Sequence, residues 1–217
     1  MSHSHARTGS LASSNSAAPG RGVRTLDQPR FEAACASLMG LVLAQYVPDL
    51  LVGIRTGGFE VAQSMARAAP HRPCVMPLTC RRKGTAAKAR FGLLPTILAA
   101  LPQTLVDSLR VMEHRLLSPR RRSNTTVQHI DHHEAAEIGR YVAASSTPTQ
   151  VLVVDDAVDS GVTLATVLRL LRQTCPEHTE IRSAVVTVTL ADPLAEPDFA
   201  LYRGVLCRFP WSFDAAR

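Results

Sequence analysis

One stretch of the chain, residues 151–163, combines an apolar run with carboxylates, hydroxyls and a glycine. Four apolar residues, Val151 to Val154, predict a strand that is buried on both faces. Asp155 and Asp156 come next, at the carboxyl end of that strand, and ligands bind at this edge of an open α/β sheet. Two adjacent carboxylates in this position suit sugar hydroxyls or a hydrated Mg²⁺ ion.

The second half of the stretch, residues 159–163, predicts a cradle for an anion. Gly161 lets the backbone approach a ligand closely, and the first N–H groups of the following helix point at the same place. An ordinary Asp-rich helix cap is the alternative, but thirteen residues in this order favour a ligand site. The stretch lacks the glycine patterns of a nucleoside-triphosphate P-loop and of a dinucleotide fold. The candidate anion ligands are Asp159, Ser160, Gly161, Val162 and Thr163.

A second glycine turn, Arg55-Thr56-Gly57-Gly58, follows another short apolar run at residues 50–54. Two glycines permit a tight turn whose backbone N–H groups can face an anion. The Arg55 guanidinium would add charge-assisted hydrogen bonds. This turn is therefore a candidate for a second anion site.

Strands and helices alternate along the chain, which predicts βαβ units and a mainly parallel, Rossmann-like sheet in an α/β fold. Asp27 is a predicted N-cap, and Asp131 is another, with Glu134 three residues later as in a capping box. The predicted helices cover residues 28 to about 46, 57–69, 132 onward and 162–174, and the predicted strands cover 50–54, 74–79, 126–130, 151–154 and 183–190.

Two segments stand apart from this alternation. Residues 1–22 are rich in Ser, Ala, Gly and His and predict a disordered tail, with a transit peptide as the alternative. Leucines at three- and four-residue steps between residues 91 and 122 predict a helical insert, broken near Pro102. The insert is either a helical hairpin packed on the domain or a lid or dimer contact.

Composition limits the function classes. The chain has 217 residues, a net charge of +6 and a pI of about 9.5, which suits a polyanionic small molecule, nucleic acid or a membrane surface. No apolar run is long enough to span a membrane. Five scattered cysteines favour reduced thiols in a cytoplasm. A cluster of His129, Asp131, His132, His133 and Glu134 could hold zinc, but its acids already have capping roles.

The stretch 151–163 closely resembles the signature with which type I phosphoribosyltransferases bind phosphoribosyl pyrophosphate (PRPP). The resemblance covers about residues 48–80 and 126–213, and it implies the type I phosphoribosyltransferase fold. It implies that Asp155 and Asp156 hold the ribose hydroxyls and, through substrate or water, Mg²⁺. It also implies that residues 159–163 wrap the 5-phosphate and that Asp159 is a catalytic acid or base.

The same resemblance assigns roles to other segments. Arg55, Thr56, Gly57 and Gly58 correspond to the pyrophosphate loop, in which members often carry a cis peptide bond. The basic stretch 81–90 lies where the family has a flexible loop that closes over PRPP. Its candidate pyrophosphate contacts are Arg81, Arg82, Lys83 and Lys88.

The C-terminal segment, about residues 200–217, is similar to the hood of xanthine/guanine-type members. In that hood an aromatic side chain stacks on the base, a position that Trp211 would fill. Those members read a purine oxygen with a Lys, and the nearest position here is Thr187. A plain hydrophobic plug is the alternative for this segment.

The resemblance implies a Mg²⁺-dependent phosphoribosyltransferase that transfers ribose 5-phosphate from PRPP to a nitrogenous base, here expected to be purine-like. We also expect a cytoplasmic homodimer. One alternative is a PRPP-sensing regulator that binds nucleic acid, and another is the reverse, phosphorolytic reaction in a specialised pathway. A third is an assembly role through the leucine-rich insert.

Overall fold

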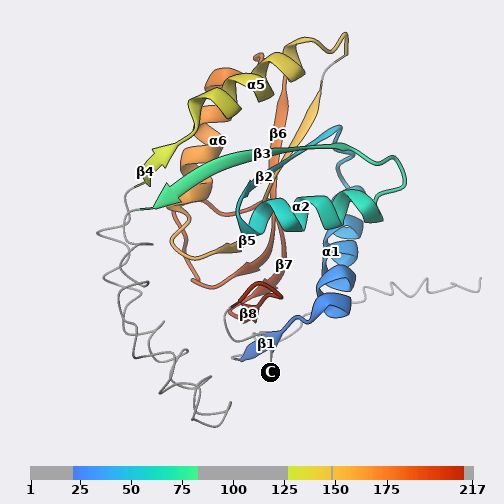
Figure 1. Cartoon of the computed structure of the whole chain (residues 1–217), viewed down its shortest axis with the longest axis vertical. Helices are drawn as coiled ribbons and strands as arrows, with labels where there is room; N and C mark the ends of the chain where they lie inside the picture. The colour runs from blue at the N-terminus through green and yellow to red at the C-terminus, as the bar shows by residue number, and fades with distance from the viewer. Residues whose placement is uncertain (1–21, 83–126, 148, 213–217) are drawn as a thin grey trace, which may run out of the picture.

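The computed structural model of the chain describes residues 22–82, 127–147 and 149–212 (Figure 1). The tail predicted for residues 1–22, apart from Gly22, and the insert predicted for 91–122 lie outside the described residues. Lys83 and Lys88 of the predicted flexible loop lie outside them as well.

A six-stranded sheet forms the centre of the fold, with the order β4-β3-β2-β5-β6-β7. All of its neighbouring strands pair in parallel except β4, which runs antiparallel to β3. The sheet therefore confirms the expected α/β class. Its strands are β2 (Leu50–Arg55), β3 (Cys74–Arg82), β4 (Val127–Ile130), β5 (Gln150–Val158), β6 (Glu180–Val188) and β7 (Phe199–Arg203).

Helices cover both faces of this sheet, as Figure 1 shows. Helices α1 (Gln28–Leu43) and α2 (Gly57–Ala68) pack on one face, against strand residues such as Leu51 and Leu152. Helices α5 (His132–Ala143) and α6 (Val162–Thr174) pack on the other face. They contact Leu50 and Val151, the residues that precede Leu51 and Leu152 in the strands. Because successive strand residues point to opposite faces, an uninterrupted apolar run fills both cores.

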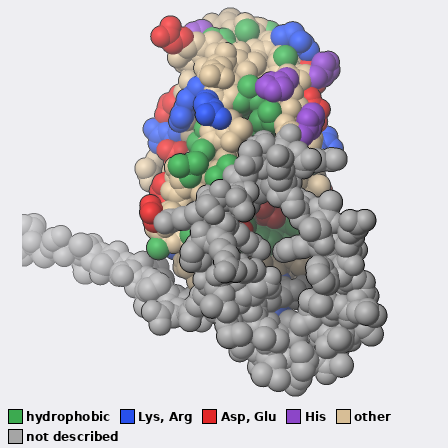
Figure 2. Space-filling view, turned by 90° about the vertical axis from the view of Figure 1, so that its left-hand side faces the viewer, with side chains coloured by type: hydrophobic (Ala, Val, Ile, Leu, Met, Phe, Trp, Pro, Cys, Tyr) green, Lys and Arg blue, Asp and Glu red, His purple; other side chains and the backbone are tan. Residues whose placement is uncertain are grey.

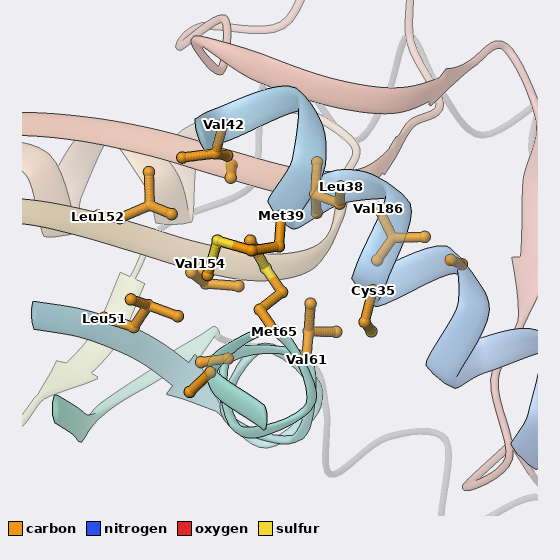
Figure 3. Packing of buried hydrophobic residues seen from close by; sticks show 14 of the residues in the cluster. Cys35, Leu38, Met39, Val42, Leu51, Val61, Met65, Leu152, Val154 and Val186 are labelled. Atoms are coloured by element: carbon orange, nitrogen blue, oxygen red, sulfur yellow. The ribbon is translucent and has the colours of Figure 1, made fainter. Parts of the chain in front are cut away.

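The core beneath α1 and α2 is drawn from both helices and from the central strands (Figure 3). Met39 of α1 and Met65 of α2 lie beside Val154 of β5 there, and these side chains and Cys35 of α1 are fully or almost fully buried. Complete burial of an apolar side chain contributes about 1.5–3 kcal/mol. This packing holds α2 against β5, and both elements carry predicted site residues.

A small parallel pair, β1 (Val23–Thr25) with β8 (Leu206–Arg208), joins the two ends of the described chain. Its contacts continue on either side of the strands, through bonds from Leu206 N to Gly22 O (3.1 Å) and from Leu26 N to Arg208 O (2.8 Å). The sequence did not predict β1, which is only three residues long. The first residues of the predicted hood segment, about 200–217, belong to β7 of the main sheet.

Element boundaries differ from the predicted ones mainly in the strands. Strands β3, β5 and β6 each have nine residues, and β5 continues through Asp155 and Asp156 instead of ending before them. Pairing with neighbouring strands extends each ladder beyond the apolar run that predicted it. At the first helix, Asp27 is the N-cap as predicted and accepts a bond from Arg30 N at 3.0 Å.

In the described part of the chain, no helix has both the length and the apolar character needed to cross a membrane.

Candidate active site

Strands β2 and β5 lie side by side in the centre of the sheet and end at the same edge. Their parallel register pairs Gly53 with Val154, so Arg55 and Asp156 each follow two residues later. The structure thereby brings together the two motifs that the sequence placed about a hundred residues apart. Carboxyl ends of central parallel strands are the usual position of a ligand site in an α/β sheet.

The glycine pair lets the start of α2 pack directly on the two acids. A Cβ atom at Gly57 would overlap the Asp156 carboxylate. A Cβ atom at Gly58 would lie 2.5 Å from Val154 O and 3.0 Å from Asp155 Oδ1. Only glycine fits at either position, and the positive end of the α2 dipole therefore lies beside both carboxylates.

The acid pair is held by the backbone and is largely withdrawn from solvent. Asp155 Oδ1 accepts a bond from Asp156 N, and Asp156 Oδ1 accepts one from Ala157 N, each at 2.9 Å. Asp155 is only 7% exposed. Burial raises the pKa of the Asp156 carboxyl, and the nearby Asp159 charge raises it further. Such a pair fits a divalent cation, which would offset the cost of the buried charges.

The predicted 5-phosphate loop joins β5 to α6 through Gly161. Gly161 has φ = 74° and is the N-cap of α6, where no side chain accepts a bond from the first turn. A Cβ atom there would lie 2.6 Å from Ala195 N and 2.8 Å from Leu194 N. The bond from Leu194 N to Ser160 O, at 2.8 Å, fixes the loop against this backing segment.

Two hydroxyls of this loop are buried. Ser160 is 5% exposed and Thr163 is 4% exposed. Among the residues that the structure describes, Ser160 Oγ has no hydrogen-bond partner. A buried hydroxyl without a partner is costly, so this atom favours a ligand with acceptor oxygens at the loop.

Asp159 is held by a residue that sequence reasoning missed. Thr189 Oγ1 donates to Asp159 Oδ1 at 2.5 Å, and Thr189 N donates to Val158 O at 2.9 Å. Thr189 follows directly after β6, the strand beside β5. The rule that site residues gather after neighbouring parallel strands could have identified it.

Arg55 opens the predicted pyrophosphate loop, and its peptide bond to Thr56 is cis, as the family resemblance led us to expect. Its guanidinium lies 5.5 Å from the centre of the Phe59 ring, and its Nε atom lies 3.7 Å from Glu134 Oε1. The Arg55 side chain is 47% exposed, so it remains accessible to a ligand.

Glu134 was predicted to complete a capping box, and that prediction is wrong. Asp131 does cap α5, through bonds from His133 N (2.9 Å) and Glu134 N (3.1 Å). The Glu134 carboxylate does not return to Asp131 N, which donates instead to Thr79 O. It accepts a bond from Thr79 N at 2.5 Å, because α5 lies against the end of β3.

The histidines around α5 lie at the surface of the described structure. His129, His132 and His133 are exposed, and histidine side chains gather on the face shown in Figure 2. No group of three potential metal ligands occurs among the described residues. The acids near these histidines are used elsewhere, by the α5 cap and by Thr79.

The residues predicted to contact a base lie near the small β1–β8 pair. Thr187 is buried, and its hydroxyl donates to Val205 O at 2.6 Å. Trp211 stacks on Phe209, with ring centres 5.0 Å apart, and meets the Phe31 ring edge-on at 5.2 Å. This packing fits the plug interpretation, and base contact by Thr187 or Trp211 stays a prediction.

Arg81 and Arg82, two of the predicted flexible-loop residues, belong to β3 and pair with β4. Strand β3 therefore ends at Arg82, and the predicted flexible loop does not begin at Arg81.

The chain is similar to a known protein domain and to several solved structures. Residues 115–215 match the family model of the phosphoribosyl transferase domain. No curated protein matches the sequence.

Solved structures match most of the chain. A purine phosphoribosyltransferase from Pyrococcus horikoshii has 16% identity and a TM-score of 0.53, with 88% of this chain and 95% of that chain covered. A xanthine-guanine-hypoxanthine phosphoribosyltransferase from Helicobacter pylori has 16% identity, a TM-score of 0.52 and the same coverage. A hypothetical protein from Neisseria gonorrhoeae with bound ppGpp has 13% identity and a TM-score of 0.55, with 90% and 92% covered.

The chain therefore has an α/β fold that it shares with solved phosphoribosyltransferases. The family match shows a phosphoribosyl transferase domain over residues 115–215, which include β5 and the Gly161 loop.

Proposed function

We propose that this protein transfers ribose 5-phosphate from PRPP to a nitrogen atom of an acceptor base and releases pyrophosphate, with Mg²⁺ as cofactor. The observation that carries this proposal is the meeting of three groups at one sheet edge. These are the glycine turn at the start of α2, the acid pair Asp155 and Asp156 on β5, and the Gly161 loop before α6. They would contact, in that order, the pyrophosphate, the ribose and the 5-phosphate of one substrate.

The acid pair would hold the ribose ring. Asp155 and Asp156 would accept bonds from its hydroxyls, and their charge would offset the positive charge that builds at C1 as the bond to pyrophosphate breaks. Bound Mg²⁺, held through substrate and water, would supply charge stabilisation for the leaving pyrophosphate. The Asp156 carboxyl must be ionised for this role, although burial raises its pKa.

The loops would hold the two ends of PRPP. Gly161 and the first turn of α6 offer backbone N–H groups to the 5-phosphate, and its oxygens would give Ser160 Oγ a partner. Arg55 and the N-terminus of α2 would face the pyrophosphate. Fixing both ends orients C1 toward the acceptor, which lowers the entropic part of the barrier.

Asp159 would take or relay the acceptor proton. It lies at the junction of the acid pair and the phosphate loop, and the Thr189 hydroxyl holds one of its carboxylate oxygens at 2.5 Å. A carboxylate oriented in this way is suited to act as a general base.

The acceptor is proposed to be a purine-like base. Two of the structural neighbours are named as purine and as xanthine-guanine-hypoxanthine phosphoribosyltransferases, which supports this choice. Thr187 and Trp211 remain the proposed base contacts. We also propose that the protein is a homodimer in the cytoplasm. Its five free cysteines fit a reducing compartment.

The direct test is an assay of pyrophosphate release with PRPP, Mg²⁺ and a panel of purine and pyrimidine bases. We expect release with one class of base, and none after the paired change Asp155→Asn and Asp156→Asn. Circular dichroism would check that the paired variant is folded. Base-dependent release that survives this change would contradict the proposal.

A nucleotide-binding regulator is the second candidate, because the Neisseria neighbour carries bound ppGpp. The net charge of +6 would also suit contacts with nucleic acid. A salt-sensitive shift of RNA or DNA, together with PRPP or ppGpp binding but no base-dependent turnover, would favour this function. Pyrophosphate-dependent breakdown of a nucleotide would instead indicate that the site runs the reverse reaction.

A further inference from the structure

The Glu134 carboxylate bridges the ends of two adjacent strands. Its Oε2 atom accepts a bond from Thr79 N on β3 at 2.5 Å, and its Oε1 atom lies 3.7 Å from Arg55 Nε on β2. Thr79 and Arg55 are themselves register partners. The carboxylate is thus fixed to the main chain on one side and faces the arginine of the proposed pyrophosphate loop on the other.

The arginine is confined on two sides. Glu134 faces its Nε atom, and the Phe59 ring, at 5.5 Å, provides a surface for its guanidinium plane. Phe59 belongs to the first turn of α2, whose N–H groups face the same site. Among the described residues, no other partner of the guanidinium is found, so its two Nη groups can bind an anion.

We propose that Glu134 is a positioning residue of the pyrophosphate site. It acts through Arg55 and does not touch the substrate. An arginine side chain that is already ordered loses less conformational entropy when it binds an anion. This inference rests on the proposed function, because it assumes that Arg55 contacts pyrophosphate.

The charge of Glu134 has an opposing effect, because it also repels the pyrophosphate. Arg55 lies between the two anions, and its side chain is about half exposed, so solvent screens the repulsion. The ordering of Arg55 by Glu134 therefore has a larger effect on affinity than the repulsion does. Removing the Glu134 carboxylate should weaken pyrophosphate binding.

The test compares Glu134→Gln with Glu137→Gln by calorimetric titration of Mg²⁺-pyrophosphate and, separately, of ribose 5-phosphate. The glutamine at 134 keeps an oxygen for Thr79 N and removes only the charge. Glu137 lies on the same helix, where it faces His133 and Arg140 at the surface, and is the matched control. We expect Glu134→Gln to weaken pyrophosphate about three- to tenfold. Its ribose 5-phosphate affinity should not change, and Glu137→Gln should change neither.

A double-mutant cycle separates positioning from a general structural role. In an Arg55→Ala background, which should itself weaken pyrophosphate more than ribose 5-phosphate, Glu134→Gln should have no further effect on pyrophosphate. A loss that persists in that background, or one that affects both ligands equally, would overturn the inference.

The outcome also separates this inference from the proposed function. Wild-type protein that binds both ligands while Glu134→Gln behaves like Glu137→Gln, or binds pyrophosphate more tightly, overturns the role of Glu134 alone. Wild-type protein that binds neither ligand overturns the proposed function, and this inference with it.

Discussion

At the scale of single residues, the site places two neighbouring carboxylates, Asp155 and Asp156, at a position with little exposure to solvent. Asp155 and Asp156 lie on β5 beside the first turn of α2, and the glycines at 57 and 58 allow this contact. Burial raises the pKa of the Asp156 carboxyl above its ordinary value of 3.8. The folded protein therefore binds this proton more tightly than the unfolded chain does. The stability that this proton contributes is complete below pH 3.8 and is lost as the pH rises through the folded-state pKa.

The single change Asp156→Asn should therefore stabilise the free protein at neutral pH, although it removes a proposed ligand of ribose. The asparagine keeps an oxygen for Ala157 N and has no charge to bury. Urea unfolding followed between pH 4 and pH 8 would test this, with Asp159→Asn as the comparison. A variant that is less stable than the parent at pH 7 would show that the carboxylate is satisfied in the folded state.

At the scale of elements, Gly161 and Gly204 both have a positive φ but differ in how closely other residues pack against them. Gly161 has φ = 74° and the backbone of Leu194 and Ala195 directly behind it. Gly204 has φ = 69°, and apart from its chain neighbours no atom of the described residues lies within 4 Å of the position of an added Cβ. An alanine at either position adopts an unfavourable conformation, but only at Gly161 must the neighbouring backbone also move.

Gly161→Ala should cost about 2–4 kcal/mol of unfolding free energy, the sum of backbone strain and overpacking. Gly204→Ala should cost only about 1–2 kcal/mol, from the backbone conformation alone. Chemical denaturation gives both values, and titration with ribose 5-phosphate should show weakened binding for Gly161→Ala only. Equal losses of affinity would mean that the segment behind Gly161 does not support the phosphate loop.

At the scale of the whole molecule, the proposed substrate would contact elements from both faces of the sheet. Helix α2 covers one face and α6 the other, and the acid pair on β5 lies between them. A ligand that binds only the folded protein raises its stability in proportion to the logarithm of its concentration.

PRPP with Mg²⁺, at about a hundred times its dissociation constant, should raise the unfolding free energy by about 2.7 kcal/mol. Addition of EDTA should remove most of this gain, because the buried acids need the cation to accept the substrate. Thermal unfolding measures the effect, and the Asp155→Asn, Asp156→Asn pair serves as the control. Stabilisation that EDTA leaves unchanged would argue against a role for Mg²⁺ at the acid pair.

Local sequence determined much of this protein. The apolar run from Val151 to Val154 predicted a buried strand, and Asp27 and Asp131 predicted the starts of two helices. Strand runs and helix caps can be predicted in this way because each involves residues that are close in the chain. The order of acids, hydroxyl and glycine after β5 predicted the family. The cis peptide after Arg55 followed from that resemblance.

The tertiary structure decided which distant residues meet. The Glu134 carboxylate binds Thr79 and faces Arg55 instead of its own helix end, and β1 pairs with β8 from the other end of the chain. Each of these contacts depends on how two strands or a helix and a strand align, and no local pattern records that alignment. Side-chain partners across the sheet could therefore be found only after the fold had set the register.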